Sequence, residues 1–268
     1  MSTINNWLRE NGETFREELK ILAREYFGIS KAQLITGADE IITSDLSNYL
    51  SESLLKLKAG TPLAYLLGYK EFWSLKFQVD HAVLIPRPET ELIVEKSIEL
   101  ASYGGCVLEL GTGSGAVSIA LAKERPDLKI TATDISNRAL EVARRNAKEH
   151  KCEIFLEHTD WFDSITGKWN LILSNPPYIA ASDPHLEFLA MEPQIALVAG
   201  QTGFEAINRI LSQAHKYLKP SGHLIMEHGL GQEGAIKNKL ANRNFSTITS
   251  HKDLANISRV VTAQWIEL

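Results

Sequence analysis

The chain has 268 residues, of which 44% are hydrophobic and 23% are charged, and its formal net charge is −5. This composition is typical of a soluble globular protein, and the length allows one large α/β domain or a small domain beside a medium one. The acidic balance disfavours a protein that grips duplex nucleic acid, because such proteins usually carry a basic excess or a basic stripe.

Several other classes of protein are disfavoured as well. No apolar run approaches the roughly 18 residues of a membrane-spanning helix, and the N-terminus lacks the basic and apolar segments of a secretion signal. Cys106 and Cys152 have no metal-ligand spacing, so we expect reduced thiols, a cytoplasmic location and no metal. The nearest basic cluster is interleaved with glutamates and is interpreted as a solvated helix face; it comprises Arg144, Arg145, Lys148 and Lys151.

Residues 1–60 are predicted to form a small helical domain. Apolar residues recur at three- and four-residue spacing from Trp7 to Phe27, and Gly28 is expected to end that helix. Further helices are predicted over Lys31–Thr36 and Asp45–Lys58, with Ser44 as the N-cap of the second. No catalytic constellation lies here, so the domain is either a structural cap or a surface that recognises a macromolecular partner.

Residues 61–84 are predicted to form a β-hairpin that links this domain to the rest of the chain. Gly60-Thr61-Pro62 interrupts the helical pattern. The first strand is expected at Tyr65–Leu67, followed by a turn at Gly68-Tyr69. The second is expected in Phe72–Val79, where apolar residues alternate with period two.

Residues 85–268 show strands alternating with helices, a pattern that predicts an α/β domain with a mostly parallel seven-stranded sheet covered on both faces. The connections between parallel strands should be right-handed. The predicted strands are Cys106–Leu110, Lys129–Thr133, Glu153–Glu157, Leu171–Ser174, His223–Glu227, Phe245–Thr249 and Arg259–Gln264. The predicted helices are Ser114–Lys123, Asn137–His150, Gly203–Tyr217 and Gln232–Ala241.

The domain begins with the run Ile85–Glu91, which has two interpretations. Pro88 and the glutamates that follow it are typical of the first turn of a helix. Arg87, however, stands between two prolines and is therefore held extended. This arginine could cover a ligand.

The unusual residues of this domain follow four successive strands at their carboxyl ends, where open α/β sheets bind ligands. The four groups are Gly111–Gly115, Asp134, Asp160-Trp161 and Asn175–Tyr178. The glycine loop alone is ambiguous. Gly111, Gly113 and Ala116 fit the dinucleotide pattern, and an acid at the end of the second strand would hold ribose hydroxyls in either a nicotinamide or an adenosyl cofactor.

The Asn-Pro-Pro-Tyr run distinguishes the two cofactors. Pro176 and Pro177 lack backbone N–H groups, so the segment is a stiff platform of acceptors beside an aromatic ring. Such a platform suits a planar –NH2 group, whereas a dehydrogenase needs a proton donor or acceptor beside the hydride. We therefore expect S-adenosylmethionine, whose sulfonium methyl is the electrophile, and S-adenosylhomocysteine as the product.

The glycine loop and the Asn-Pro-Pro-Tyr run resemble those of class I methyltransferases, which have a Rossmann-like fold and modify planar nitrogens. Three further runs closely resemble the release-factor glutamine methyltransferases, and the resemblance covers nearly the whole chain. These runs are Ile85–Glu91, Glu192–Leu197 and Glu227–Gln232. The segment Asp253–Arg259 departs from that family because it lacks the glycine that usually follows Asp-Leu-Ala.

The resemblance implies methylation of the side-chain amide nitrogen (N5) of the glutamine in the Gly-Gly-Gln motif of peptide chain release factors 1 and 2. We expect a monomer that binds neither nucleic acid nor membrane. The expected catalytic residues are Asn175, Pro176 and Tyr178. The expected cofactor-binding residues are Gly111, Thr112, Gly113, Ser114, Gly115, Asp134, Ile135, Asp160, Trp161 and Asn175. The expected substrate-binding residues are Asn175, Pro176, Pro177, Tyr178, Arg87 and Pro88.

Three alternatives remain open. Adenine-N6 methyltransferases of DNA and guanine-N2 methyltransferases of RNA share the Asn-Pro-Pro-Tyr motif. A protein that binds release factors or senses the adenosyl ligand without catalysis would show no transfer with cofactor bound. A dehydrogenase would bind a nicotinamide dinucleotide.

Overall fold

The computed structural model describes residues 3–12, 14–30, 32 and 41–267, and it divides the chain into two compact units, Met1–Tyr69 and Lys70–Leu268. The division falls inside the first strand of the hairpin. The predicted helix at Lys31–Thr36 lies outside the described residues, apart from Ala32.

The first unit is built from helices α1 (Ile4–Asn11), α2 (Arg16–Phe27), α4 (Ser44–Lys58) and α5 (Leu63–Leu67), which share one apolar core. The single periodic run is divided into two helices, because Gly12 ends α1. Gly28 takes the left-handed conformation (φ 66°) at the end of α2, as predicted. The predicted cap of α4 is wrong: Thr43, not Ser44, accepts the hydrogen bond from the Leu46 N–H.

The hairpin consists of β1 (Tyr69–Phe72) and β2 (Leu75–Gln78), joined by a turn in which Trp73 and Ser74 both have positive φ. The predicted strand at Tyr65–Leu67 is therefore wrong, because this segment is helix α5. Leu66 and Leu67 pack against the core of the first unit, and leucine is also a strong helix former.

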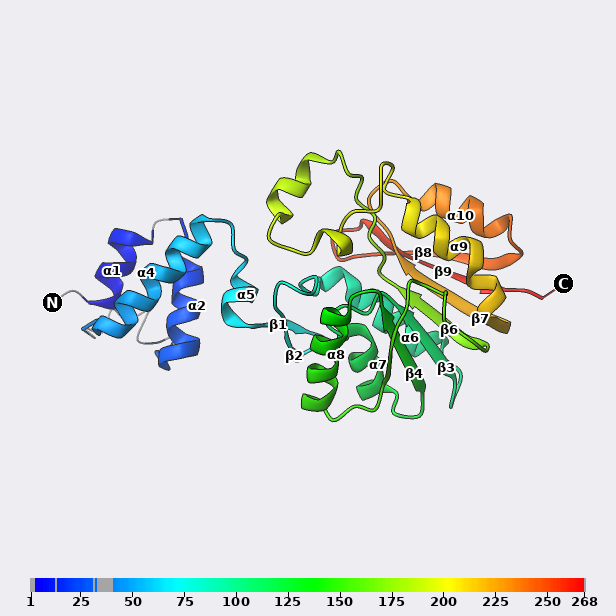
Figure 1. The fold of residues 1–268 in the computed structure, drawn as a ribbon, viewed down its shortest axis with the longest axis horizontal. Coiled ribbons are helices and arrows are strands. Elements are labelled where there is room, and N and C mark those ends of the chain that lie inside the picture. Colours follow the sequence, from blue (N-terminus) through cyan, green and yellow to red (C-terminus); the bar gives the residue numbers. More distant parts are fainter. Residues whose placement is uncertain (1–2, 13, 31, 33–40, 268) are drawn as a thin grey trace. The chain divides into compact units, whose positions relative to one another are not determined.

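The second unit is an α/β domain around a seven-stranded sheet in the order β5-β4-β3-β6-β7-β9-β8 (Figure 1). Strands β3 (Cys106–Leu110), β4 (Lys129–Asp134), β5 (Phe155–His158), β6 (Trp169–Ser174) and β7 (Leu218–Glu227) pair in parallel. Strand β9 (Ser258–Trp265) is antiparallel to β7 and to β8 (Phe245–Lys252). The expected mostly parallel seven-stranded sheet is thus confirmed.

Helices cover both faces of the sheet, and alternate strand residues face the two layers. One core contains Val107 and Leu171 with α6 (Glu91–Leu100), α7 (Ala116–Glu124) and α8 (Asn137–Glu149). The other contains Leu108 and Ile172 with α9 (Glu205–Tyr217) and α10 (Glu233–Ala241). Figure 1 shows α7 and α8 on one side of the sheet and α9 and α10 on the other.

The order of the strands reverses between β3 and β6, since β4 and β5 lie on one side of β3 and β6 lies on the other. Ligands of open α/β sheets bind at such a switch point, beyond the carboxyl ends of the strands. The glycine loop follows β3 and the Asn-Pro-Pro-Tyr run follows β6, so the two motifs flank this point.

The segment Asp253–Arg259, in which a glycine was expected after Asp-Leu-Ala, forms a tight turn. The Asn256 N–H donates to the Asp253 carbonyl, and Asn256 has φ of 63°. Asparagine is among the residues that best tolerate this left-handed conformation. The turn therefore forms without a glycine, and the Asp253–Arg259 ion pair of 2.8 Å closes it.

Candidate active site

A cavity of about 380 Å³ lies at the switch point. Its walls come from the ends of β3, β4 and β6, from the loop after β5, from residues 82–90 before α6, and from residues 195–209, which include the first turns of α9. Eleven of the residues expected to form the site line it: Arg87, Gly111, Thr112, Gly113, Ser114, Asp134, Ile135, Asp160, Trp161, Asn175 and Pro177. Four other expected residues lie outside the lining: Pro88, Gly115, Pro176 and Tyr178.

The glycine loop turns from β3 into α7, and its last glycine has a packing role. Gly115 is the N-cap of α7 with φ of 81°. A Cβ at this position would lie 3.2 Å from the Ala143 Cβ and 3.0 Å from the Ile119 Cδ1. A side chain here would therefore strain the backbone and push α7 away from α8.

Asp134 at the end of β4 fixes the glycine loop. One carboxylate oxygen accepts from the Gly113 N–H at 2.9 Å, and the other accepts from the Ser136 N–H at 2.9 Å. Burial raises the pKa of this carboxyl, although hydrogen bonds from Ser136 and Gly113 oppose the rise. The N-cap of α8 is Ser136, which accepts from the Ala139 N–H, so helix capping does not explain Asp134.

The loop after β5 adds an aromatic wall and an ion pair. Trp161 has φ of 54°, and its ring lies 3.7 Å from the position of a Cβ on Gly111. Asp160 forms an ion pair with Arg209 at 2.6 Å. Arg209, which also lines the cavity, comes from α9, and its part in this wall was not predicted.

Glu109 is a buried acid beneath the glycine loop. Its Oε2 accepts hydrogen bonds from the hydroxyls of Thr112, at 2.7 Å, and Ser118. Burial raises the pKa of Glu109 to about 7, and the two hydroxyl bonds oppose that rise. The carboxyl therefore joins the loop to the first turns of α7.

Replacing Glu109 by glutamine should flatten the pH dependence of stability. The folded state binds the Glu109 proton more tightly than the unfolded state does, because the pKa rises from 4.5 to about 7. This contribution to stability is present below pH 4.5 and is lost as the pH rises through 7. The wild-type free energy of unfolding should fall, relative to that of Glu109→Gln, by roughly 2 to 3 kcal/mol between about pH 5 and pH 8.

Urea unfolding curves at a series of pH values measure this difference. Glu52→Gln, at an exposed position on α4, is the matched control and should follow the wild-type profile. If the free energies of unfolding of the wild type and Glu109→Gln change in parallel with pH, Glu109 does not have a raised pKa in the folded state.

The Asn-Pro-Pro-Tyr run directly follows β6, and two of its residues, Asn175 and Pro177, line the cavity. The Asn175 Nδ2 donates to the Thr90 Oγ1 at 3.1 Å. The Tyr178 hydroxyl donates to the Glu227 Oε1 at 3.2 Å, and its ring packs against the core beneath α9 and α10. Burial, followed by the charge of Glu227, raises the pKa of this phenol.

Two buried side chains hold the segments around this run. Glu192, 5% exposed, accepts from the Ile85 N–H at 3.0 Å and forms an ion pair with Arg87. Gln232 donates to the carbonyls of Tyr178 and Gly203 at 3.1 and 3.0 Å. Both residues lie in sequence runs that carry the family resemblance, but the sequence does not predict that either belongs to the site.

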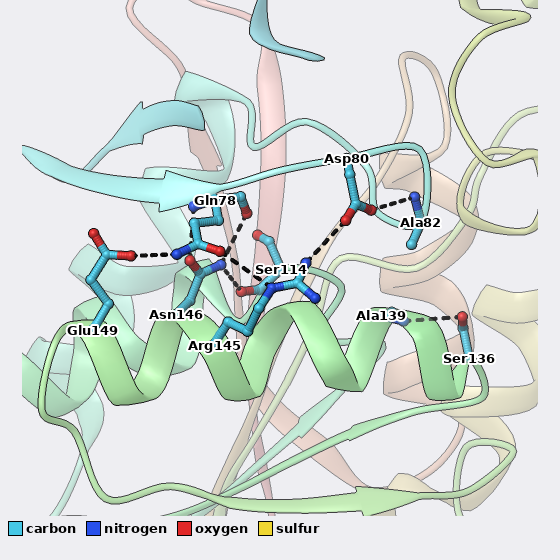
Figure 2. Close-up of polar contacts among 9 residues, drawn as sticks. All are labelled: Gln78, Asp80, Ala82, Ser114, Ser136, Ala139, Arg145, Asn146 and Glu149. Carbon is cyan, nitrogen blue, oxygen red and sulfur yellow. Dashed lines mark hydrogen bonds and ion pairs between the residues drawn. The ribbon is translucent and has the colours of Figure 1, made fainter. Parts of the chain in front are cut away.

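Asn146 on α8 joins the hairpin to the glycine loop (Figure 2). It is fully buried. Its Oδ1 accepts from the Gln78 N–H at 2.8 Å, and its Nδ2 donates to the carbonyls of Gln78 and Ser114 at 3.1 and 2.8 Å. Beside it, Arg145 contacts Asp80, and Asp80 accepts from the Ala82 N–H. The strand that leads into the cavity wall is thereby fixed to α8.

Replacing Asn146 by leucine should destabilise the second unit by about 2 to 4 kcal/mol. The change keeps the size of the side chain but leaves the backbone groups of Gln78 and Ser114 unpaired in a buried place. Urea unfolding measures the loss. Glu149→Gln on the same helix is the control, since a glutamine can still accept the bond from Gln78. A loss below about 0.5 kcal/mol, the usual size for a surface change, would contradict the prediction.

The described part of the chain has neither a cluster of metal ligands nor a membrane-spanning helix. Within residues 3–12, 14–30, 32 and 41–267, no cluster of His, Cys, Asp and Glu is suited to a metal ion. Over the same residues, no helix has the length and apolar character to cross a bilayer.

Comparison with known proteins gives matches over both units. Residues 89–252 match the family model of the methyltransferase small domain, and residues 4–68 match that of the PrmC N-terminal domain. The chain is 40% identical to the release factor glutamine methyltransferase of Yersinia pestis, covering 93% of this chain and 92% of that protein. It is 34% identical to the release factor glutamine methyltransferase of Aliivibrio fischeri, covering 98% and 95%.

A solved structure supports the fold. The 16S rRNA methyltransferase RsmC of T. thermophilus, in complex with AdoMet (S-adenosylmethionine) and guanosine, matches with a TM-score of 0.55. The identity is 16%, and the match covers 74% of this chain and 49% of that chain. This likeness concerns the fold alone.

Proposed function

The chain belongs to the release factor glutamine methyltransferases, which are S-adenosylmethionine-dependent enzymes, and we propose that it methylates the side-chain amide nitrogen of the glutamine in the Gly-Gly-Gln motif of release factors 1 and 2. One observation carries the proposal. Asn175 stands at the edge of the cavity with its Nδ2 bonded to Thr90, so its Oδ1 is available to accept an N–H of the substrate.

The cofactor is proposed to lie between the glycine loop and the loop after β5. Gly111–Ser114 line the cavity, and their backbone is proposed to contact the amino-acid part and the ribose. Asp134 would accept from ribose hydroxyls, and Ile135 and Trp161 would enclose the adenine. Asp160 contributes through its ion pair with Arg209, which steadies this wall. Bound there, S-adenosylmethionine would supply an electrophilic sulfonium methyl.

The protein contributes alignment and hydrogen-bond acceptors. An amide nitrogen is a weak nucleophile, because its lone pair is delocalised into the carbonyl. The Asn175 Oδ1 and the Pro176 carbonyl are proposed to accept its two N–H bonds, which orients the lone pair and stabilises the positive charge that develops. Orientation of reactants alone can contribute about 7–11 kcal/mol. A C–N bond forms as the S–CH3 bond breaks, and the nitrogen releases one proton to solvent.

The remaining residues are proposed to hold the substrate over the cavity. Arg87, fixed by Glu192, would cover the cofactor and the glutamine together with Pro88. Pro177 lines the cavity beside Asn175. Tyr178, whose hydroxyl is held by Glu227, would pack its ring near the amide plane. The net charge of −5 favours a protein substrate over a nucleic acid.

Mass spectrometry of a release factor incubated with this protein and S-adenosylmethionine tests the proposal. The peptide that contains Gly-Gly-Gln should gain the mass of one CH2, and fragmentation should place the gain on the glutamine side chain. A release factor with that glutamine replaced by alanine should gain nothing. Methylation of the replaced release factor, or no methylation of the normal one with cofactor bound, would overturn the proposal.

A further inference from the structure

A hydrogen-bonded chain of three side chains runs from the buried end of β7 to the cavity. The Thr90 Oγ1 donates to the Glu227 Oε2 at 2.6 Å, and the Asn175 Nδ2 donates to the Thr90 Oγ1 at 3.1 Å. Glu227 is 2% exposed and Thr90 is 6% exposed. The three residues come from β7, from the short 3-10 helix η1 (Pro88–Thr90), and from the residue that follows β6.

The order of donors and acceptors gives this chain a direction. A hydroxyl has one hydrogen, and the Thr90 hydroxyl donates it to the Glu227 carboxyl when that carboxyl is ionised. Burial raises the pKa of Glu227 to about 7, so this direction holds above that pH. Thr90 therefore offers Asn175 only lone pairs, which can bind the Nδ2 but not the Oδ1. The alternative orientation of the Asn175 amide would place its oxygen against the oxygen of Thr90. The chain thus leaves the Asn175 Oδ1 as the free acceptor at the cavity edge.

Glu227 does not itself line the cavity. Thr90 and Asn175 line the cavity, whereas Glu227 is outside its lining and is held from the other side by the Tyr178 hydroxyl at 3.2 Å. A residue in this place is poorly suited to take a proton from the substrate. It is well placed to fix the hydroxyl that fixes Asn175.

We propose that Thr90 and Glu227 are positioning residues that set the Asn175 amide with its oxygen toward the substrate nitrogen. This rests on the proposed function, in which Asn175 accepts an N–H of the substrate amide. Without the Thr90 hydroxyl, Asn175 rotates between two orientations, and one of them presents an N–H to the substrate N–H. Such misalignment of a reacting group lowers the rate of transfer without removing the cofactor site.

Thr90→Val tests the proposal, because valine keeps the branched shape and lacks the hydroxyl. We expect kcat to fall about 10- to 100-fold, with the Kd for S-adenosylmethionine changed by less than about threefold. Thr90→Ser restores the hydroxyl and should recover most of kcat. The matched control is Thr262→Val on β9, where an equally buried threonine bonds to His251 away from the cavity; it should keep the wild-type kcat.

The outcomes separate this inference from the proposed function. A wild-type protein that does not methylate the release factor defeats the proposed function. If the wild type is active and Thr90→Val has the same kcat as Thr262→Val, the inference alone is contradicted. A Thr90→Ser variant with a kcat as low as that of Thr90→Val also contradicts the inference alone. A change confined to cofactor affinity would make Thr90 a cofactor contact and would also overturn the inference.

The wild-type protein offers a second measurement that does not depend on the folding of a variant. In NMR spectra, the side-chain amide protons of Asn175 should exchange with solvent more slowly than those of the exposed Asn238 on α10. Equal exchange rates would show that the Asn175 Nδ2 is not held by the hydrogen bond to Thr90, and would contradict the proposal.

Discussion

Replacing Asn175 by alanine is expected to lower kcat for methyl transfer by about 100- to 1,000-fold, the usual effect of removing a hydrogen-bonding group that acts in the transition state. The change removes the Oδ1 that is proposed to accept from the substrate nitrogen. It also removes the bond to Thr90 but leaves the glycine loop and Asp134 intact. Cofactor affinity should therefore fall much less than kcat does.

Single-turnover kinetics with release factor and labelled S-adenosylmethionine give this rate, and calorimetry gives the cofactor Kd. The control is Asn238→Ala, on the exposed side of α10. A rate for Asn175→Ala within about threefold of the control would contradict the role of the Asn-Pro-Pro-Tyr platform.

Replacing Asp134 by alanine is expected to weaken the binding of S-adenosylmethionine by about 100-fold. The carboxylate is proposed to accept from ribose hydroxyls, and hydrogen bonds to a charged group contribute about 1.5–3 kcal/mol each. The same carboxylate accepts from the N–H groups of Gly113 and Ser136, so its loss also loosens the glycine loop. Both effects act on cofactor affinity in the same direction.

Calorimetric titration with S-adenosylhomocysteine measures this affinity without turnover. Asp134→Asn should fall between the wild type and Asp134→Ala, because the amide keeps one oxygen acceptor. Asp45→Ala, at an exposed position on α4, should match the wild type. An affinity for Asp134→Ala within threefold of the wild type would place the ribose elsewhere.

The sequence predicted the second unit closely because its strands are short apolar runs between clear helix signals. Strand Cys106–Leu110 has the predicted bounds, and the other predicted strands differ from the observed ones by a few residues at their ends. Central parallel strands are buried on both faces and therefore read as continuous apolar runs. The bounds of β7 were the least well predicted, since it begins at Leu218 and includes Pro220 and Gly222.

The segment that was assigned the wrong type of element, and the turn that was missed, lie in and beside the first unit, where the local sequence signals are weak. Tyr65–Leu67 is too short for its apolar pattern to distinguish a strand from a helix, and Gly68, with φ of 77°, ends a short helix there. The true turn of the hairpin contains Trp73 and Ser74, which are not the glycine or asparagine that usually mark such turns. Nothing in the local sequence indicates that turn.

Part of the candidate site could be predicted, because each of its motifs is local and follows a strand. The residues that support these motifs could not be predicted, because they come from distant parts of the sequence. Thr90 bonds to Glu227 across 137 positions of sequence, and Ile85 bonds to Glu192 across 107. Only the fold brings such pairs together. In the sequence, such a supporting residue is marked only by its position as a glutamate at the end of an apolar run, as at Glu227. Packing explains that pattern equally well, so the sequence alone does not assign it a role in the site.

The most direct measurement of the central claim is one assay with labelled S-adenosylmethionine and three substrates side by side: purified release factor, DNA and RNA. We predict label on the glutamine of the release factor, its loss with Asn175→Ala, and none on either nucleic acid. Label on DNA or RNA with none on the release factor would contradict the account and assign the platform to a nucleobase.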